Sequence, residues 1–134
     1  MTDILVDSNV LIDVLTQDPV WADWSSSNLL RLSGTTSLVI NPLIYAEAAS
    51  GFDSLEALDE WLPTNLYRRD ALPYEAAFLA AKAFTQYRRR GGMRRSPLPD
   101  LYIGAHAATM GYDLLTRDPS RYRTYFPNVS LIAP

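Results

Sequence analysis

The stretch that decides the fold lies near the N-terminus and reads Ile4-Leu5-Val6-Asp7-Ser8-Asn9-Val10-Leu11-Ile12-Asp13. Three consecutive apolar residues before Asp7 are typical of a short buried strand. After Asp7, the apolar residues Val10, Leu11 and Val14 recur at helical spacing. A buried strand that leads directly into such a helix favours a parallel sheet with helices on its faces. Asp7 would then stand just beyond the end of a strand.

The same alternation of strand and helix continues along the chain, and it predicts an α/β fold with a mostly parallel sheet. At 134 residues, the chain is long enough for one compact core and too short for two, so we expect a single domain over residues 1–134. Strands are predicted at 3–6, 38–40, 65–68, 114–117 and 129–132. Helices are predicted at 9–15, 19–32, 42–49, 53–62, 74–90 and 100–108, with a short one after Pro119.

Several of these helices have an apolar face that we expect to point into the core. In the helix at 74–90, this face contains Ala77, Phe78, Ala81 and Phe84. In the helix at 53–62, the residues expected to face inward are Leu55, Leu58, Trp61 and Leu62.

Composition excludes several kinds of protein. There is no cysteine, which removes disulfides and thiolate metal sites. No apolar run approaches the roughly 20 residues of a membrane span. The N-terminus also lacks the basic start and long apolar stretch of a signal peptide. We therefore expect a soluble cytoplasmic protein that does not engage a membrane.

Charge is distributed very unevenly. The net charge is −3, but residues 1–67 hold ten acidic residues and one basic residue, whereas residues 68–134 hold eleven basic and five acidic residues. This asymmetry suggests a polyanion-binding face beside an acidic one. Five of the arginines are concentrated in residues 88–95. Their alternative role is to stabilise the C-terminal end of a helix that stops at Gly91-Gly92.

Four carboxylates are placed where an open α/β sheet would bring them together: Asp7, Glu47, Asp100 and Asp118. Asp7 and Asp118 follow predicted strands, while Glu47 and Asp100 are carried by predicted helices. Carboxylates that converge outside the carboxyl ends of parallel strands make a site for hard divalent cations. Each aspartate taken singly could instead be a helix cap or a turn residue. Glu47 lies on a largely apolar helix, where a buried carboxylate would need a partner.

Two uncharged residues extend this set. Asn9 lies two residues after Asp7, and Thr116 lies two residues before Asp118, so each could hydrogen-bond a carboxylate. The single histidine, His106, cannot supply a ribonuclease site built on paired histidines or a zinc site. No phosphate-binding glycine loop and no nucleophilic serine elbow is present.

The motifs Asp7-Ser8-Asn9, mid-chain Glu47, Pro99-Asp100 and Thr116-Arg117-Asp118 occur in order, and with them the chain resembles a PIN-domain ribonuclease. More narrowly, it resembles the VapC-type toxins of bacterial toxin–antitoxin pairs. The resemblance covers nearly the whole chain. It implies an α/β/α sandwich with four or five parallel strands, a pocket for Mg²⁺ or Mn²⁺, endoribonuclease activity, homodimerisation and neutralisation by a small antitoxin.

The resemblance assigns Asp7, Glu47, Asp100 and Asp118 to the acidic set, with Asn9 and Thr116 as polar supports. Asp7, Asp100 and Asp118 are expected to contact the metal. Water, rather than the ribose 2′-hydroxyl, is the expected nucleophile for the cleavage of RNA. The arginines expected to hold RNA phosphates are Arg88, Arg89, Arg90, Arg94, Arg95 and Arg117.

Other functions remain open at this point. A housekeeping RNA-processing nuclease would share the site but would have no antitoxin. A non-catalytic binding module could keep the acidic pocket without activity. A metal phosphatase of the aspartyl-phosphate type is disfavoured, because it needs a second aspartate where this chain has Asn9.

Overall fold

The computed structural model describes residues 2–95 and 98–134, and it confirms the predicted fold as an α/β/α sandwich. Within these residues, five strands form one sheet in the order β3-β2-β1-β4-β5, and each neighbouring pair is parallel. The strands are β1 (Ile4–Val6), β2 (Leu38–Ile40), β3 (Tyr67–Arg69), β4 (Asp113–Leu115) and β5 (Leu131–Ile132).

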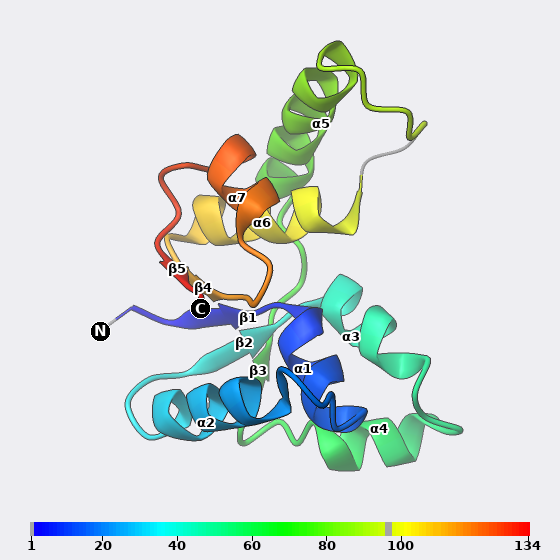
Figure 1. The fold of residues 1–134 in the computed structure, drawn as a ribbon, viewed down its shortest axis with the longest axis vertical. Coiled ribbons are helices and arrows are strands. Elements are labelled where there is room, and N and C mark those ends of the chain that lie inside the picture. Colours follow the sequence, from blue (N-terminus) through cyan, green and yellow to red (C-terminus); the bar gives the residue numbers. More distant parts are fainter. Residues whose placement is uncertain (1, 96–97) are drawn as a thin grey trace.

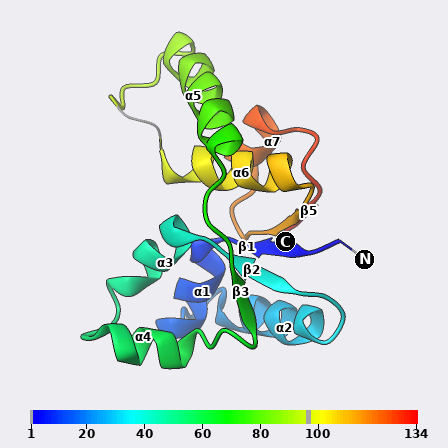
Figure 2. The ribbon, with the colours of Figure 1, turned by 180° about the vertical axis from the view of Figure 1, so that it is seen from behind.

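Helices cover both faces of the sheet. In Figures 1 and 2, α5, α6 and α7 lie on one side of the strands, and α1 to α4 lie on the other. The helices are α1 (Ser8–Leu15), α2 (Ala22–Ser33), α3 (Pro42–Ala49), α4 (Leu55–Trp61), α5 (Tyr74–Arg89), α6 (Pro99–Met110) and α7 (Ser120–Tyr125). Among the described residues, none of the helices has both the length and the apolar composition to cross a membrane.

The central strand of the sheet is β1. It pairs with β2 on one side and with β4 on the other. The chain therefore adds β2 and β3 on one side of β1, and then β4 and β5 on the other. Such a switch point leaves a crevice outside the carboxyl ends of the strands, where α/β proteins bind their ligands. The N–H of Asp7 donates to the carbonyl oxygen of Leu115 at 2.9 Å. This bond holds the end of β1 beside the end of β4.

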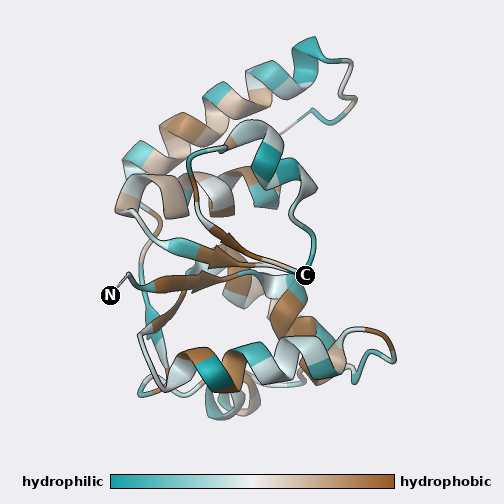
Figure 3. Cartoon of the chain, turned by 60° about the vertical axis from the view of Figure 1, so that its left-hand side comes forward, coloured by the Kyte–Doolittle hydropathy of each residue, from teal (hydrophilic) through white to brown (hydrophobic). Residues whose placement is uncertain are grey.

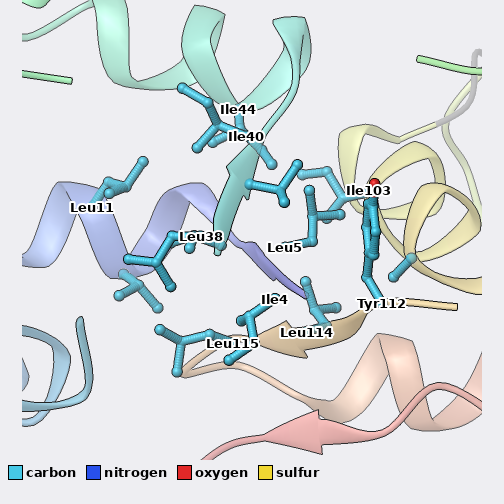
Figure 4. Close-up of a cluster of buried hydrophobic side chains, with 14 of the residues drawn as sticks. Ile4, Leu5, Leu11, Leu38, Ile40, Ile44, Ile103, Tyr112, Leu114 and Leu115 are labelled. Atoms are coloured by element: carbon cyan, nitrogen blue, oxygen red, sulfur yellow. The ribbon is translucent and has the colours of Figure 1, made fainter. Parts of the chain in front are cut away.

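The core fills the space between the strands and the two helical layers. Figure 4 shows Leu5 and Leu114 of the sheet, Leu11 of α1, Ile44 of α3 and Ile103 of α6 in this cluster. All five side chains are buried. Each such side chain contributes roughly 1.5–3 kcal/mol of transfer free energy. Because β1 and β2 are buried throughout, they appear in the sequence as short uninterrupted apolar runs.

The predicted inner face of α5 is only partly correct. The buried residues of this helix are Ala76, Ala80 and Ala83, whereas Phe78 is 62% exposed and Ala81 is also exposed. Small residues let two helices approach closely, and α5 packs on α6 along this alanine stripe. Phe78 and Leu79, on the other sides of the helix, therefore point outward, whereas Phe84 packs against the core.

The predicted orientation of Leu55 is also wrong, because this residue is 63% exposed, while Leu58 and Leu62 are buried as expected. Leu55 is the first residue of α4 and lies outside the stripe that meets the core. Another difference concerns α2, which begins at Ala22 rather than Pro19. The carboxylate of Asp18 accepts the N–H groups of the two residues before α2, at 2.9 Å each, so these residues form a turn.

Candidate functional site

Asp7 is the innermost residue of the predicted acidic set and is only 3% exposed. Its Oδ2 atom accepts hydrogen bonds from the Tyr122 hydroxyl at 2.7 Å, the Thr116 hydroxyl at 2.9 Å and the Asn9 amide at 3.3 Å. Asn9 also donates to the Thr116 hydroxyl at 3.2 Å. The two predicted polar supports therefore lie beside Asp7, and they come from opposite ends of the chain.

The charge of Asp7 is costly to maintain. Burial raises the pKa of its carboxyl to about 6; the Tyr122 hydrogen bond opposes this shift, and the charges of Asp100 and Glu47 add to it. Among the described residues, no arginine, lysine or histidine forms an ion pair with Asp7. The buried carboxylate is therefore solvated by neutral donors alone, and a cation would stabilise it.

Glu47 is joined to the same site through Ser8. The Ser8 hydroxyl donates to Glu47 Oε1 at 2.9 Å, which links the first turn of α1 to α3. Asp7 occupies the N-cap position of α1 and makes no side-chain cap bond. Burial raises the pKa of the Glu47 carboxyl; the Ser8 hydrogen bond lowers it and the charge of Asp100 raises it.

Asp100 lies in the first turn of α6 and has a cationic partner. Arg121 Nη1 is 3.2 Å from Asp100 Oδ2. Burial raises the pKa of the Asp100 carboxyl; Arg121 lowers it and the charge of Asp118 raises it. Because Asp100 acts on the pKa of both Asp7 and Glu47, these three carboxylates share one electrostatic environment.

Asp118 lies at the rim and is exposed. Its backbone N–H donates to the Thr116 hydroxyl at 3.1 Å, and the Ser120 hydroxyl donates to its Oδ1 at 3.4 Å. Asp118 reaches the rest of the set through its repulsion with Asp100. The structure thus brings all four predicted carboxylates to the carboxyl edge of the sheet, with Asp7 innermost and Asp118 outermost.

These residues fit a hard divalent cation in their chemistry. Every candidate ligand is a carboxylate oxygen, and the innermost carboxylate is buried without a counter-charge. Within residues 2–95 and 98–134, no three acidic or histidine side chains are already grouped tightly enough to hold a metal ion. Asp7 is held by Tyr122 and Thr116, while Asp100 is paired with Arg121.

The predicted RNA-binding arginines of the 88–95 stretch lie at the C-terminal end of α5 and just beyond it. Figure 1 shows this end projecting past α6 and α7, and in Figure 3 it is strongly hydrophilic. Arg88 donates to the carbonyl oxygen of Arg94 at 2.7 Å. The guanidinium of Arg90 lies 5.3 Å from the ring centroid of Tyr125. The exposed members of this cluster are Arg88, Arg89, Arg90, Arg94 and Arg95.

Arg117, the sixth predicted RNA-binding arginine, has a structural partner. Its Nε atom lies 2.9 Å from Oδ2 of Asp13, a carboxylate that is 1% exposed. Asp13 also accepts a 2.8 Å hydrogen bond from the Ser25 hydroxyl. The backbone N–H of Arg117 donates to Asn9 Oδ1 at 3.3 Å. Arg117 therefore connects the loop after β4 with α1, which lies across the site.

Three residues contact the carboxylates of the site although the sequence did not predict these contacts: Tyr122, Arg121 and Ser8. The contact of Tyr122 with Asp7 depends on tertiary packing, because α7 must approach α6 closely to bring the Tyr122 hydroxyl to Asp7. A Cβ atom at Gly104 would clash with the ring of Phe126 and lie 3.0 Å from Tyr122 Cδ1. Glycine at this position of α6 is therefore the one signal in the sequence for the approach of Tyr122.

The sequence was compared with protein-family models and with curated proteins, and the structure with solved structures. The family model of the PIN domain matches residues 4–127. A comparison with curated proteins found no match.

Several solved structures share the fold. VapBC2 from Rickettsia felis, bound to a promoter DNA fragment, has a TM-score of 0.73 at 18% identity, and the match covers 98% of both chains. DNA-bound VapBC from Salmonella typhimurium has a TM-score of 0.71 at 17% identity, over 99% of this chain and 98% of that one. A toxin–antitoxin complex from Klebsiella pneumoniae has a TM-score of 0.66 at 18% identity, over 94% of both chains.

Proposed function

The chain belongs to the PIN-domain family, and from this premise we propose that it is a divalent-cation-dependent endoribonuclease and the toxin of a toxin–antitoxin pair. The observation that carries the enzymatic part is Asp7, a buried carboxylate with a raised pKa and neutral hydrogen-bond donors only. Such a group destabilises the fold unless a ligand uses it. Two further carboxylates that interact with it, Glu47 and Asp100, make that ligand a cation.

Each residue of the site has a role in this reaction. Mg²⁺ or Mn²⁺ held by Asp7, Asp100 and Asp118 would activate water and stabilise negative charge on the scissile phosphate. Glu47 would accept the proton of the attacking water, because its raised pKa brings it closer to neutrality. Asn9 and Thr116 keep Asp7 in place.

The arginines would bind the substrate. The cluster at Arg88, Arg89, Arg90, Arg94 and Arg95 is exposed. It lies at the end of α5, which packs on α6, the helix that carries Asp100. Contacts between arginines and phosphates supply affinity without sequence preference. RNA is available in the cytoplasm, where we propose that the protein acts.

The test of the enzymatic proposal is cleavage of RNA in Mg²⁺ with analysis of the product ends. Hydrolysis by activated water leaves 5′-phosphate and 3′-hydroxyl ends, and EDTA should stop it. Asp100→Asn should lower kcat by about a hundredfold or more. The control is Asp23→Asn, which changes an exposed residue in the first turn of α2. Products ending mainly in 2′,3′-cyclic phosphate would refute the mechanism.

The toxin part of the proposal is supported by the solved neighbours, among them a toxin–antitoxin complex. An antitoxin arginine could pair with the acidic site, and an apolar segment could lie on α2. On this helix and just before it, Leu30 and Val20 are exposed, near the edge-to-face pair of Trp21 and Trp24.

Co-expression with the adjacent small reading frame tests this partner. We expect a tight complex that does not cleave RNA when Mg²⁺ is added. A protein that stays free and active at every concentration of the partner would leave the housekeeping nuclease as the function.

We also propose a homodimer, formed through α5. This helix exposes Tyr74 and Phe78, on the side opposite its alanine stripe, and a second copy would cover them. Phe78→Ser should shift the protein toward monomer in sedimentation velocity. The matched control is Leu55→Ser, because Leu55 is equally exposed on a different helix. Equal dimerisation of the two variants would exclude α5 as the interface.

A further inference from the structure

The only histidine of the chain is fully buried in α6 and faces an asparagine. Its Nδ1 atom is 3.0 Å from the side-chain nitrogen of Asn41. The other side-chain atom of Asn41, Oδ1, accepts the N–H of Ile44 at 3.0 Å and so caps α3. Because the cap uses the oxygen, Asn41 presents a donor to His106. Nδ1 must therefore be an acceptor, and the ring proton must be on Nε2.

The other side of the ring is less constrained. Within the described residues, His106 Nε2 has no hydrogen-bond partner, and its closest charged group is Asp70 Oδ2 at 3.7 Å. Asp70 is bound by the Tyr112 hydroxyl at 2.5 Å and by Arg68 Nε at 3.2 Å. The ring of Tyr112 also packs against His106, with centroids 5.8 Å apart. Asp70, Tyr112 and, through Asp70, Arg68 are thus the titratable and charged groups around the imidazole.

The bond between Asn41 and His106 joins two helices that carry site carboxylates. Asn41 begins α3, which carries Glu47, and His106 lies on α6, which carries Asp100. We propose that Asn41 and His106 form a positioning pair that holds Glu47 in register with Asp100, and that protonation of His106 releases this pair. The effect on catalysis rests on the proposed nuclease function, whereas the state of the ring does not.

The chemistry of imidazole explains the release. A protonated ring carries N–H groups on both nitrogens, so Nδ1 would meet Asn41 donor to donor. The conflict ends only if Asn41 moves away or turns its amide, and turning the amide removes the cap of α3. Burial lowers the pKa of His106, against an opposing effect of Asp70. The neutral ring, and with it the intact pair, is therefore the form present at neutral pH.

The first experiment reads the ring directly. In a protein without a histidine tag, the single histidine gives one set of imidazole ¹⁵N resonances. At pH 7.5 we expect an unprotonated Nδ1 and a protonated Nε2, and the Ile44 amide should be protected from exchange. Below the titration of His106, this protection should be lost. A proton on Nδ1, a charged ring at pH 7.5, or unchanged Ile44 protection across the titration would overturn the proposal.

The second experiment measures the consequence for cleavage. His106→Leu removes the acceptor of the Asn41 amide and should lower kcat about fivefold to tenfold at unchanged KM, as expected for the loss of one buried hydrogen bond. His106→Asn offers an acceptor near the Nδ1 position. It should restore kcat at neutral pH. It should also abolish the fall of kcat at acidic pH (the acid limb) that protonation of His106 causes in the parent protein. Tyr112→Phe is the control, because it changes the surroundings of Asp70 and leaves the pair intact.

The two experiments fail separately. A parent protein without nuclease activity refutes the proposed function, while the NMR result still decides the pairing. Should His106→Leu fail to fold, the comparison of His106→Asn with the parent across pH remains decisive. An acid limb identical in both proteins would show that His106 has no part in it.

Discussion

The hydroxyl of Tyr122 donates a 2.7 Å hydrogen bond to the carboxylate of Asp7, 115 positions earlier in the chain. Burial, together with the charge of Asp7, raises the pKa of Tyr122 well above its ordinary value. The phenol therefore keeps its proton and remains a neutral donor. It orients the innermost carboxylate of the site but does not cancel its charge, which leaves that charge for a cation.

Replacing Asp7 with asparagine should stabilise the cation-free protein above pH 6. Burial raises the pKa of this carboxyl from 3.8 to about 6, so between these values the folded state binds more protons than the unfolded state. The free energy of unfolding therefore falls as pH rises through this window, by about 3 kcal/mol in total. Asp7→Asn should remove this loss and abolish RNA cleavage.

Urea unfolding at pH 5 and pH 7.5, without divalent cations, checks the change. Glu47 and Asp100 also have raised pKa values, so a smaller dependence of the same sign should persist in the variant. A variant less stable than its parent at pH 7.5 would contradict the electrostatic explanation.

Removing Arg121 should tighten cation binding. Its guanidinium pairs with Asp100, a proposed metal ligand, so the cation must compete with it. Both partners are partly exposed, which limits the gain from Arg121→Gln to about fivefold. Mn²⁺ titration followed by electron paramagnetic resonance measures this affinity without RNA. The matched control, Arg123→Gln, removes an exposed arginine from the same helix. Equal affinities in both variants would mean that only net charge matters.

Replacing Arg88, Arg89 and Arg90 together with glutamine should weaken RNA binding and flatten its dependence on salt. Each lost phosphate contact reduces the slope of log K against log salt by about 0.7 for a single strand. Fluorescence anisotropy at several salt concentrations, with an inactive Asp100→Asn background, gives this slope. The control is Lys82→Gln, earlier on the same helix. An unchanged slope would mean that the three arginines do not bind RNA and only stabilise the C-terminal end of α5.

A double-mutant cycle on Asp13 and Arg117 separates the two roles of Arg117. Arg117→Met leaves the buried carboxylate of Asp13 without its cation and should cost about 2–3 kcal/mol of stability. Adding Asp13→Asn should recover much of this loss. If Arg117 also binds RNA, the double variant should regain stability but not RNA affinity. Recovery of both would leave Arg117 with a structural role only.

The strands and the acidic set were predictable because each follows from a short local pattern. Leu38 to Ile40 is a buried strand that appears as an apolar run. Asn41 and Pro42 are residue types that favour the N-cap and first position of a helix, and α3 begins there. Asp7 and Asp118 come after such strands, so their meeting at one edge follows from the parallel topology. The hydrogen bond from Tyr122 of α7 to Asp7 cannot be predicted from the sequence in this way, because it depends on how α7 packs on α6.

The incorrect helix faces have a related cause. In α5, the sequence offered Phe78 on one side and Ala76 and Ala80 on another, and hydrophobicity alone favoured the phenylalanine. The structure buries the alanines, because the distance between α5 and α6 is set by the smallest side chains. Arg117 shows the same limit for charge, since nothing in its local sequence indicates the ion pair with Asp13, which lies more than a hundred positions earlier.

Gly104 extends the site to a residue without any functional group. Its missing side chain is what allows Phe126 and Tyr122 to rest against α6. A single added methyl group would push α6, which carries Asp100, away from α7, which carries Tyr122. The proposed activity should therefore depend on position 104 through shape alone, and Gly104→Ala should impair it although no functional group of the site is changed.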